Sequence, residues 1–132
     1  MKRYYISPIV GTGAEDDSYR PKVADYGVSW VGVIPRNPDT GRPVYPWSLV
    51  LVEAVSHAAL LADRDIKALP DFPMDGKVSA INTATRNRMT TDLQGKGIDT
   101  SFIGAADGYR DVIRGIGRSL EASFDENGFD VA

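Results

Sequence analysis

The sequence contains no cysteine and a single histidine, His57. The absence of cysteine excludes disulfide-stapled folds, thiolate zinc sites, iron–sulfur clusters and cysteine nucleophiles. A zinc ion at His57 would need three carboxylate or water ligands around one imidazole, unlike ordinary zinc sites. We therefore predict no metal, no cofactor and no catalytic residue.

Long hydrophobic runs are also missing. No window approaches the roughly 20 apolar residues that a membrane-spanning helix requires. Pro8 interrupts the first apolar stretch before the core of a signal peptide could form. The sequence therefore favours a soluble, unprocessed protein with no membrane partner.

A strong excess of one charge is missing too. The 15 Lys and Arg residues oppose 18 Asp and Glu residues, a formal net charge of -3. Domains that grip nucleic-acid phosphates usually carry a marked basic excess, so nucleic acid is not the expected partner. The segment from Ser119 onward contains acidic residues and no basic residue. It could therefore dock to a charged neighbour, although a solvated tail is the simpler interpretation.

The composition that remains is that of a globular domain. Apolar residues make up 42% of the chain and charged residues 25%, and the 132 residues match the size of one domain. A chain of this length buries about two-thirds of its unfolded surface on folding. We predict one domain spanning residues 1–132.

The first half of the chain has strand patterns. Apolar alternation predicts strands over Arg3–Val10, Tyr26–Ile34 and Trp47–Val55. The second has apolar groups on both faces, which favours a central position. Glu53 interrupts a face of the third strand, so it is expected at the sheet margin or beside a partner. Prolines and Gly41 predict a hairpin tip between these strands.

The second half has helical periodicity. Helices are predicted over residues 57–62, 77–94 and 108–123, capped by Ser56, Asp75 and Asp107. Gly95 or Gly97 is expected to end the second helix. The third helix should have one buried apolar stripe, made of Tyr109, Val112, Ile113, Ile116 and Leu120. Gly115 and Gly117 weaken the last helix, which indicates a close backbone contact there. The fold class expected is α+β, a small antiparallel β-sheet of three or more strands packed against two main α-helices.

One alternative function is a small enzyme or ligand-binding domain centred on His57. Ser56 or Ser48 with Glu53 could complete a nucleophilic triad, and the 63–75 loop could add carboxylates. The chain lacks the strained serine turn with flanking glycines that such hydrolases use. A lone histidine at a strand-to-helix junction more often packs or caps.

The glycine-rich loop after the first strand suggests two ligand types. Its Gly11-Thr12-Gly13 run lacks the third glycine of a dinucleotide loop, and the acidic residues 15–17 would repel a pyrophosphate. The same carboxylates could hold calcium, but without the alternate spacing of a calcium loop. A flexible or partner-contacting loop is the favoured interpretation.

A second alternative function is a modulator that binds nucleic acid or an acidic partner. Arg110, Arg114 and Arg118 recur every four residues and would form a basic ridge on the last helix. No aromatic residues interleave with them, as single-strand binders require. A solvated helix face is the simpler interpretation.

Aromatic residues gather in the first half of the chain, where they could fill the core or anchor an interface. The expected interface comprises the 11–23 loop, the 35–46 hairpin and the tail from Phe124. Its candidate residues are Tyr19, Arg20, Asn37, Asp39, Arg42, Tyr45, Trp47, Phe124 and Phe129.

Three parts of the sequence carry a resemblance: YYISPIVGTG and YRPKV at residues 4–13 and 19–23, LPDFPMD at residues 69–75, and YRDVIR at residues 109–114. Together they resemble small, uncharacterised virion-associated proteins of tailed bacteriophages. The resemblance implies a non-enzymatic structural part of a particle, such as a capsid, neck or tail component, assembled in the host cytoplasm. It also implies that the chain contacts copies of itself or neighbouring virion proteins. No functional residue is carried over from it.

Overall fold

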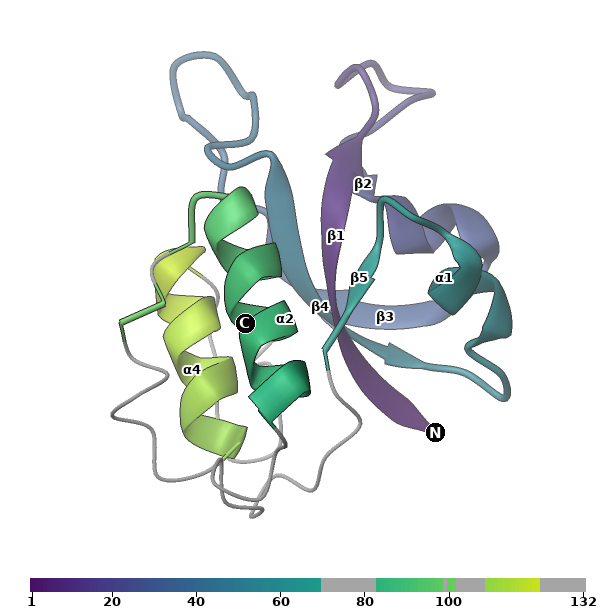
Figure 1. Cartoon of the computed structure of the whole chain (residues 1–132). Helices are drawn as coiled ribbons and strands as arrows, with labels where there is room; N and C mark the ends of the chain where they lie inside the picture. The colour runs from purple at the N-terminus through teal and green to yellow at the C-terminus, as the bar shows by residue number, and fades with distance from the viewer. Residues whose placement is uncertain (70–82, 99, 102–108, 122–132) are drawn as a thin grey trace.

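The computed structural model describes residues 1–69, 83–98, 100–101 and 109–121 (Figure 1). A curled antiparallel sheet occupies the first half of the chain and two substantial helices the second, so the predicted α+β class is confirmed. The elements in chain order are β1 (Lys2–Val10), β2 (Arg20–Pro21), the 3-10 helix η1 (Lys22–Tyr26), β3 (Ser29–Gly32), β4 (Trp47–Glu53), α1 (Ala58–Ala62), β5 (Lys67–Ala68), α2 (Thr83–Gly95) and α4 (Tyr109–Ser119). None of the described helices is long and apolar enough to cross a membrane.

Strand β1 organises the sheet. It runs antiparallel to β4 along most of its length, from Lys2 opposite Glu53 to Pro8 opposite Trp47. Its other side pairs with β2 near the strand end and with β5 in the middle. Strand β3 pairs with β4, which gives the order β2-β1-β4-β3 with β5 beside β1.

The second predicted strand, Tyr26–Ile34, forms over a shorter range, but its predicted central position in the sheet was wrong. Tyr26 belongs to η1, and Gly27 ends this helix at a φ of 71°. The strand that follows, β3, pairs only with β4 among the described residues and so lies at an edge. Its two apolar faces have another cause, because Trp30 and Val31 pack against the two opposite layers that cover the sheet.

The sheet is the middle of three layers, and its side chains alternate between two cores. Helices α2 and α4 lie side by side along one flank, and α1 lies on the other (Figure 1). The core under α2 and α4 contains Tyr4, Ile6, Leu49, Leu69, Met89, Leu93, Ile98, Val112, Ile113, Ile116 and Leu120. The core on the other face contains Tyr5, Val23, Val50, Val52, Leu60 and Ile66.

The predicted apolar stripe of the last helix is confirmed. Val112, Ile113 and Ile116 are fully buried, and Leu120 is buried one residue after the helix ends. Gly115 and Gly117 are buried as well. The proposed caps Asp75 and Asp107, and residues 77–82 of the other predicted helix, lie outside the described residues.

Helix α2 ends at Gly95, as predicted, and its end is a Schellman motif. The Ile98 N–H donates to the Leu93 carbonyl and the Gly97 N–H to the Gln94 carbonyl, both at 3.0 Å. Gly97 has a φ of 73°, a conformation that favours glycine. The turn brings Ile98 back beside Leu93 in the core.

The third predicted strand ends earlier than expected. Strand β4 stops at Glu53, and Val55 is fully exposed rather than facing the sheet. Glu53 lies at the margin with a partner, as predicted, since its carboxylate is 2.8 Å from the amino group of Met1. That hydrogen bond holds the pKa of Glu53 below its ordinary value.

Candidate interaction surface

The loop after β1 is closed by its own backbone. The N–H groups of Thr12 and Gly13 donate to the Asp17 carbonyl at 3.1 and 3.0 Å. The Asp17 N–H donates to the Ala14 carbonyl at 3.0 Å. Gly11 has a φ of 107°, and a Cβ there would lie 2.4 Å from the Ser18 carbonyl oxygen. The glycines are therefore explained by a tight turn rather than by a phosphate.

Arg20 braces this loop against η1. Its guanidinium donates to the carboxylates of Asp25 and Asp17 at 2.6 and 2.8 Å, and to the Ser18 carbonyl at 2.9 Å. The bond from Arg20 holds the pKa of Asp17 below its ordinary value. A cation is thus already supplied to this carboxylate, and no group of three His, Cys, Asp or Glu residues is placed for a metal within the described part of the chain.

The hairpin between β3 and β4 has the predicted tip. The Asn37 side-chain oxygen accepts the N–H groups of Asp39 and Thr40 at 2.8 and 3.3 Å, which is an Asx turn. Asn37 also exchanges backbone bonds with Gly41 and Arg42 at 2.7 and 2.8 Å. The exposed side chains of this tip therefore stand on a backbone that is fixed locally.

The two loops meet at one end of the sheet and enclose a groove. Figure 1 shows both leaving the same end of β1 and β4. The Ile9 N–H donates to the Pro46 carbonyl at 3.0 Å, and the Arg36 guanidinium lies 5.5 Å from the centre of the Tyr19 ring. The groove has a volume of about 380 Å³ and is lined by Ile9, Tyr19, Arg42, Pro43, Val44, Tyr45 and Pro46.

Sequence reasoning thus placed three groove residues, Tyr19, Arg42 and Tyr45, on one surface. Tyr45 and Trp47 are half-buried and also pack against the core under α2 and α4. The Tyr45 hydroxyl donates to Glu121 at 3.1 Å, which raises the tyrosine pKa. Phe124 and Phe129, predicted for the same interface, lie outside the described residues.

His57 is buried, with 3% of its surface exposed. Its Nδ1 is 2.7 Å from the Tyr5 hydroxyl and its Nε2 is 3.0 Å from the Met1 carbonyl oxygen. A carbonyl only accepts, so Nε2 carries the proton and Nδ1 accepts from Tyr5. The tyrosine and imidazole rings also stack, with centroids 5.7 Å apart. Both ring nitrogens are therefore occupied by hydrogen bonds within the fold.

The serines considered as partners of His57 have other bonds. The Ser48 hydroxyl donates to the Val33 carbonyl at 3.0 Å, and the Ser56 hydroxyl accepts the Ala58 N–H at 3.3 Å. The N-cap of α1 is His57 rather than the predicted Ser56, and its side chain makes no capping bond there. The described geometry does not assemble the serine–histidine pair of a hydrolase.

The basic ridge on α4 is described only in part. Arg118 is exposed and Arg114 is half-buried, whereas the side chain of Arg110 lies outside the described residues. Arg118 belongs to the last turn of the helix, where a cation favours the helix dipole.

Asp63 joins η1 to the segment after α1. Its carboxylate accepts the Tyr26 hydroxyl at 2.5 Å, lies 2.9 Å from the Lys22 ammonium, and accepts the Asp65 N–H at 2.9 Å. The side chain is only 6% exposed. The bonds from Tyr26 and Lys22 lower the pKa of Asp63 from 3.8 to about 2.

Replacing Asp63 by asparagine is expected to destabilise the chain at pH 7 by about 1–2 kcal/mol, since hydrogen bonds to a charged group are lost. The folded-state pKa of about 2 lies below the ordinary 3.8, so the ionised carboxylate stabilises the fold above pH 4. The difference between the two proteins in urea denaturation should therefore shrink as the pH falls from about 4 to 2. Asp65→Asn, at a side chain 60% exposed, serves as the control and should change little. A constant difference across this range would contradict the assignment.

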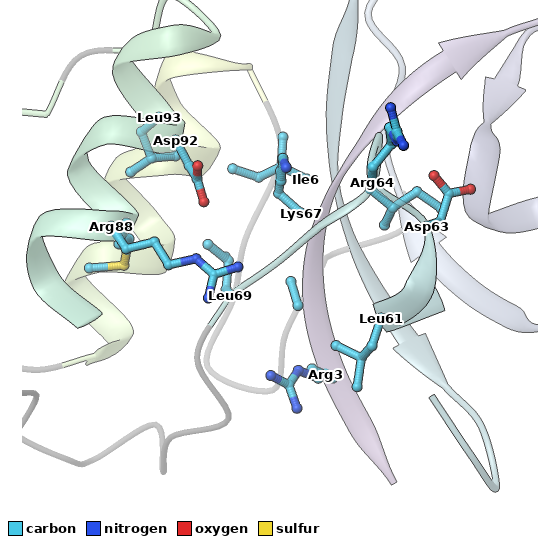
Figure 2. Close-up of a pocket in the computed structure, with 13 residues that line it drawn as sticks. Arg3, Ile6, Leu61, Asp63, Arg64, Lys67, Leu69, Arg88, Asp92 and Leu93 are labelled. Atoms are coloured by element: carbon cyan, nitrogen blue, oxygen red, sulfur yellow. The ribbon is translucent and has the colours of Figure 1, made fainter. Parts of the chain in front are cut away.

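A second cavity was not predicted from the sequence. It has a volume of about 460 Å³ and lies between β1, β5 and α2 (Figure 2). Basic side chains from separate segments line it: Arg3, Arg64, Lys67 and Arg88. No local motif connects them, because only the β1–β5 pairing and the packing of α2 bring them together.

Comparisons with protein-family models, with curated proteins and with solved structures found no match to this chain.

Proposed function

We propose that the protein is a non-enzymatic structural subunit of a tailed-bacteriophage particle, acting by self-association or by contacts with neighbouring virion proteins. The groove between the two loops is the observation that carries this proposal, because it presents Tyr19, Arg42 and Tyr45 together at one end of the sheet. The sequence resemblance to virion-associated proteins supplies the kind of particle.

The chemistry of this end suits a protein contact. Tyrosine and arginine are the side chains enriched at the energetic centres of interfaces, and a polar rim commonly surrounds them. Val44 adds a large apolar side chain that is 48% exposed.

The loops are also held in place before any partner arrives. Arg20 fixes the first loop through two carboxylates, and Asn37 fixes the hairpin through its Asx turn. Loops fixed in this way lose little conformational entropy on binding. A second copy is the partner to test first, since repeated subunits of particles meet one another and such contacts are usually symmetric.

The mass of the purified chain in solution tests the proposal. Light scattering after size separation, across a concentration series, is expected to give a discrete oligomer or particles that grow with concentration. The monomer has a mass of 14.3 kDa. A monomer throughout the series would contradict self-association and restrict the proposal to assembly on a different virion protein.

A further inference from the structure

The cavity between β1, β5 and α2 has an excess of positive charge that the described chain does not neutralise. Within the described residues, Arg3, Arg64, Lys67 and Arg88 form neither an ion pair nor a side-chain hydrogen bond. Figure 2 shows Arg3 of β1 and Arg88 of α2 extending their guanidinium groups into the space between strand and helix. The whole chain is acidic, so this local excess is not a sample of a generally basic surface.

Arg3 gives the second observation. Its Nε is buried, and no hydrogen-bond partner reaches it within the described part of the chain. A buried donor of a charged group costs free energy when it makes no hydrogen bond. Native structures usually satisfy such donors with a protein group, a water molecule or an ion. A ligand oxygen that reached this atom would supply the hydrogen bond that the described residues do not make.

The acidic residues at the cavity do not cancel the charge. Asp63 is already bound by Lys22 and Tyr26, and Figure 2 shows its carboxylate directed away from α2. The Arg64 guanidinium also lies away from α2 in Figure 2, which leaves Asp92 against Arg3, Lys67 and Arg88 among the described lining residues.

We propose that this cleft binds a small organic phosphate, a phosphate monoester with an apolar body. Guanidinium groups form paired hydrogen bonds with phosphate oxygens, and here two of them enter the same space from opposite walls. The apolar part of the ligand would lie on the floor, made of Ile6, Leu61, Ile66, Leu69, Met89 and Leu93. A volume of about 460 Å³ falls within the usual range of small-molecule sites.

This proposal is independent of particle assembly, because the cleft and the loop groove share no lining residue. A small phosphate is favoured over an acidic peptide since the two arginines converge on one space, whereas a peptide spreads its carboxylates along an extended chain. A long nucleic acid is disfavoured by the net charge of -3.

Isothermal titration calorimetry of the full chain at low salt, in a buffer without phosphate, tests the proposal. Phenyl phosphate is expected to bind more tightly than inorganic phosphate, because only the ester has an apolar body for the floor. Arg88→Gln, at an exposed position of α2, is expected to weaken phenyl phosphate binding about tenfold or more. Arg118→Gln, an exposed arginine outside the cleft, is the matched control and should leave binding unchanged.

Further variants separate charge from geometry. Arg88→Lys keeps the charge but loses the paired donors of the planar guanidinium. Its affinity for phenyl phosphate should therefore fall between those of the parent and Arg88→Gln. Lys67→Gln should weaken binding as well, and circular dichroism establishes that each variant is folded. The proposal is overturned if neither phosphate binds at millimolar concentration, if Arg88→Gln and Lys67→Gln bind as the parent does, or if hexaglutamate binds and phenyl phosphate does not.

Discussion

Replacement of His57 by alanine is expected to lower the free energy of unfolding by about 3 kcal/mol. The change removes a buried ring that stacks on Tyr5 and hydrogen-bonds at both nitrogens, to the Tyr5 hydroxyl and the Met1 carbonyl. A domain with a total stability of about 5–15 kcal/mol would lose a large part of it. Urea denaturation at pH 7 measures the loss.

Two further variants make this result specific. Val55→Ala, at a fully exposed site two residues before His57, should change stability by less than about 0.5 kcal/mol. Tyr5→Phe, alone and combined with His57→Ala, should give a coupling energy of about 1 kcal/mol.

A small effect of His57→Ala would instead favour the enzyme hypothesis. Catalytic residues are commonly held at some cost to stability, so their removal often leaves the fold unchanged or more stable. A loss below about 1 kcal/mol would therefore contradict the packing role that the hydrogen bonds assign to this residue.

The sheet could be predicted wherever its strands alternate. Leu49 and Leu51 face one core and Val50 and Val52 the other, as the period of two requires. The same alternation places Tyr4 and Tyr5 on opposite faces of β1. The stripe of α4 was equally clear, because a spacing of three and four residues is specific to a helix.

The order of the strands could not be predicted in this way. Apolar residues on both faces of β3 indicate that other layers cover both faces of the sheet. They do not indicate how many strands pair with β3. Strands β2 and β5 are only two residues long, too short for any periodicity. They form because backbone N–H and C=O groups of β1 are available to pair with them. This pairing depends on the tertiary structure and not on the local sequence.

The candidate surface was predictable where turn chemistry is local. Asn37 and Gly41 define the hairpin tip through bonds that span only a few residues. The cleft was not predictable, since Arg3 and Arg88 meet only after the sheet and α2 have packed. From sequence alone, a charged residue on the polar face of a strand or helix is expected to be exposed to solvent. The sequence pattern is the same when that residue lines a cavity.

Exchanging the hairpin tip, residues 37–41, for a two-residue Asn-Gly turn is expected to convert the assembled protein into a monomer, slightly lighter than the 14.3 kDa parent chain. The residues of the tip are exposed and lie beyond the last bridge of the hairpin, Arg36 opposite Pro43, so the sheet should be unaffected. Light scattering reports the mass, and circular dichroism with urea denaturation reports the fold.

The control for this exchange is Val55→Ala, which alters an exposed apolar residue at the other end of β4 and should leave assembly unchanged. Arg42→Glu provides a finer test, because it inverts one charge at the groove without shortening the chain. If both groove variants assemble like the parent, the loops are not the contact surface. If the tip exchange alone blocks assembly, the contact depends on the tip rather than on the groove. Loss of assembly in both, with an unchanged midpoint of unfolding, would place the contact on the groove and the tip together, since neither change touches the two cores.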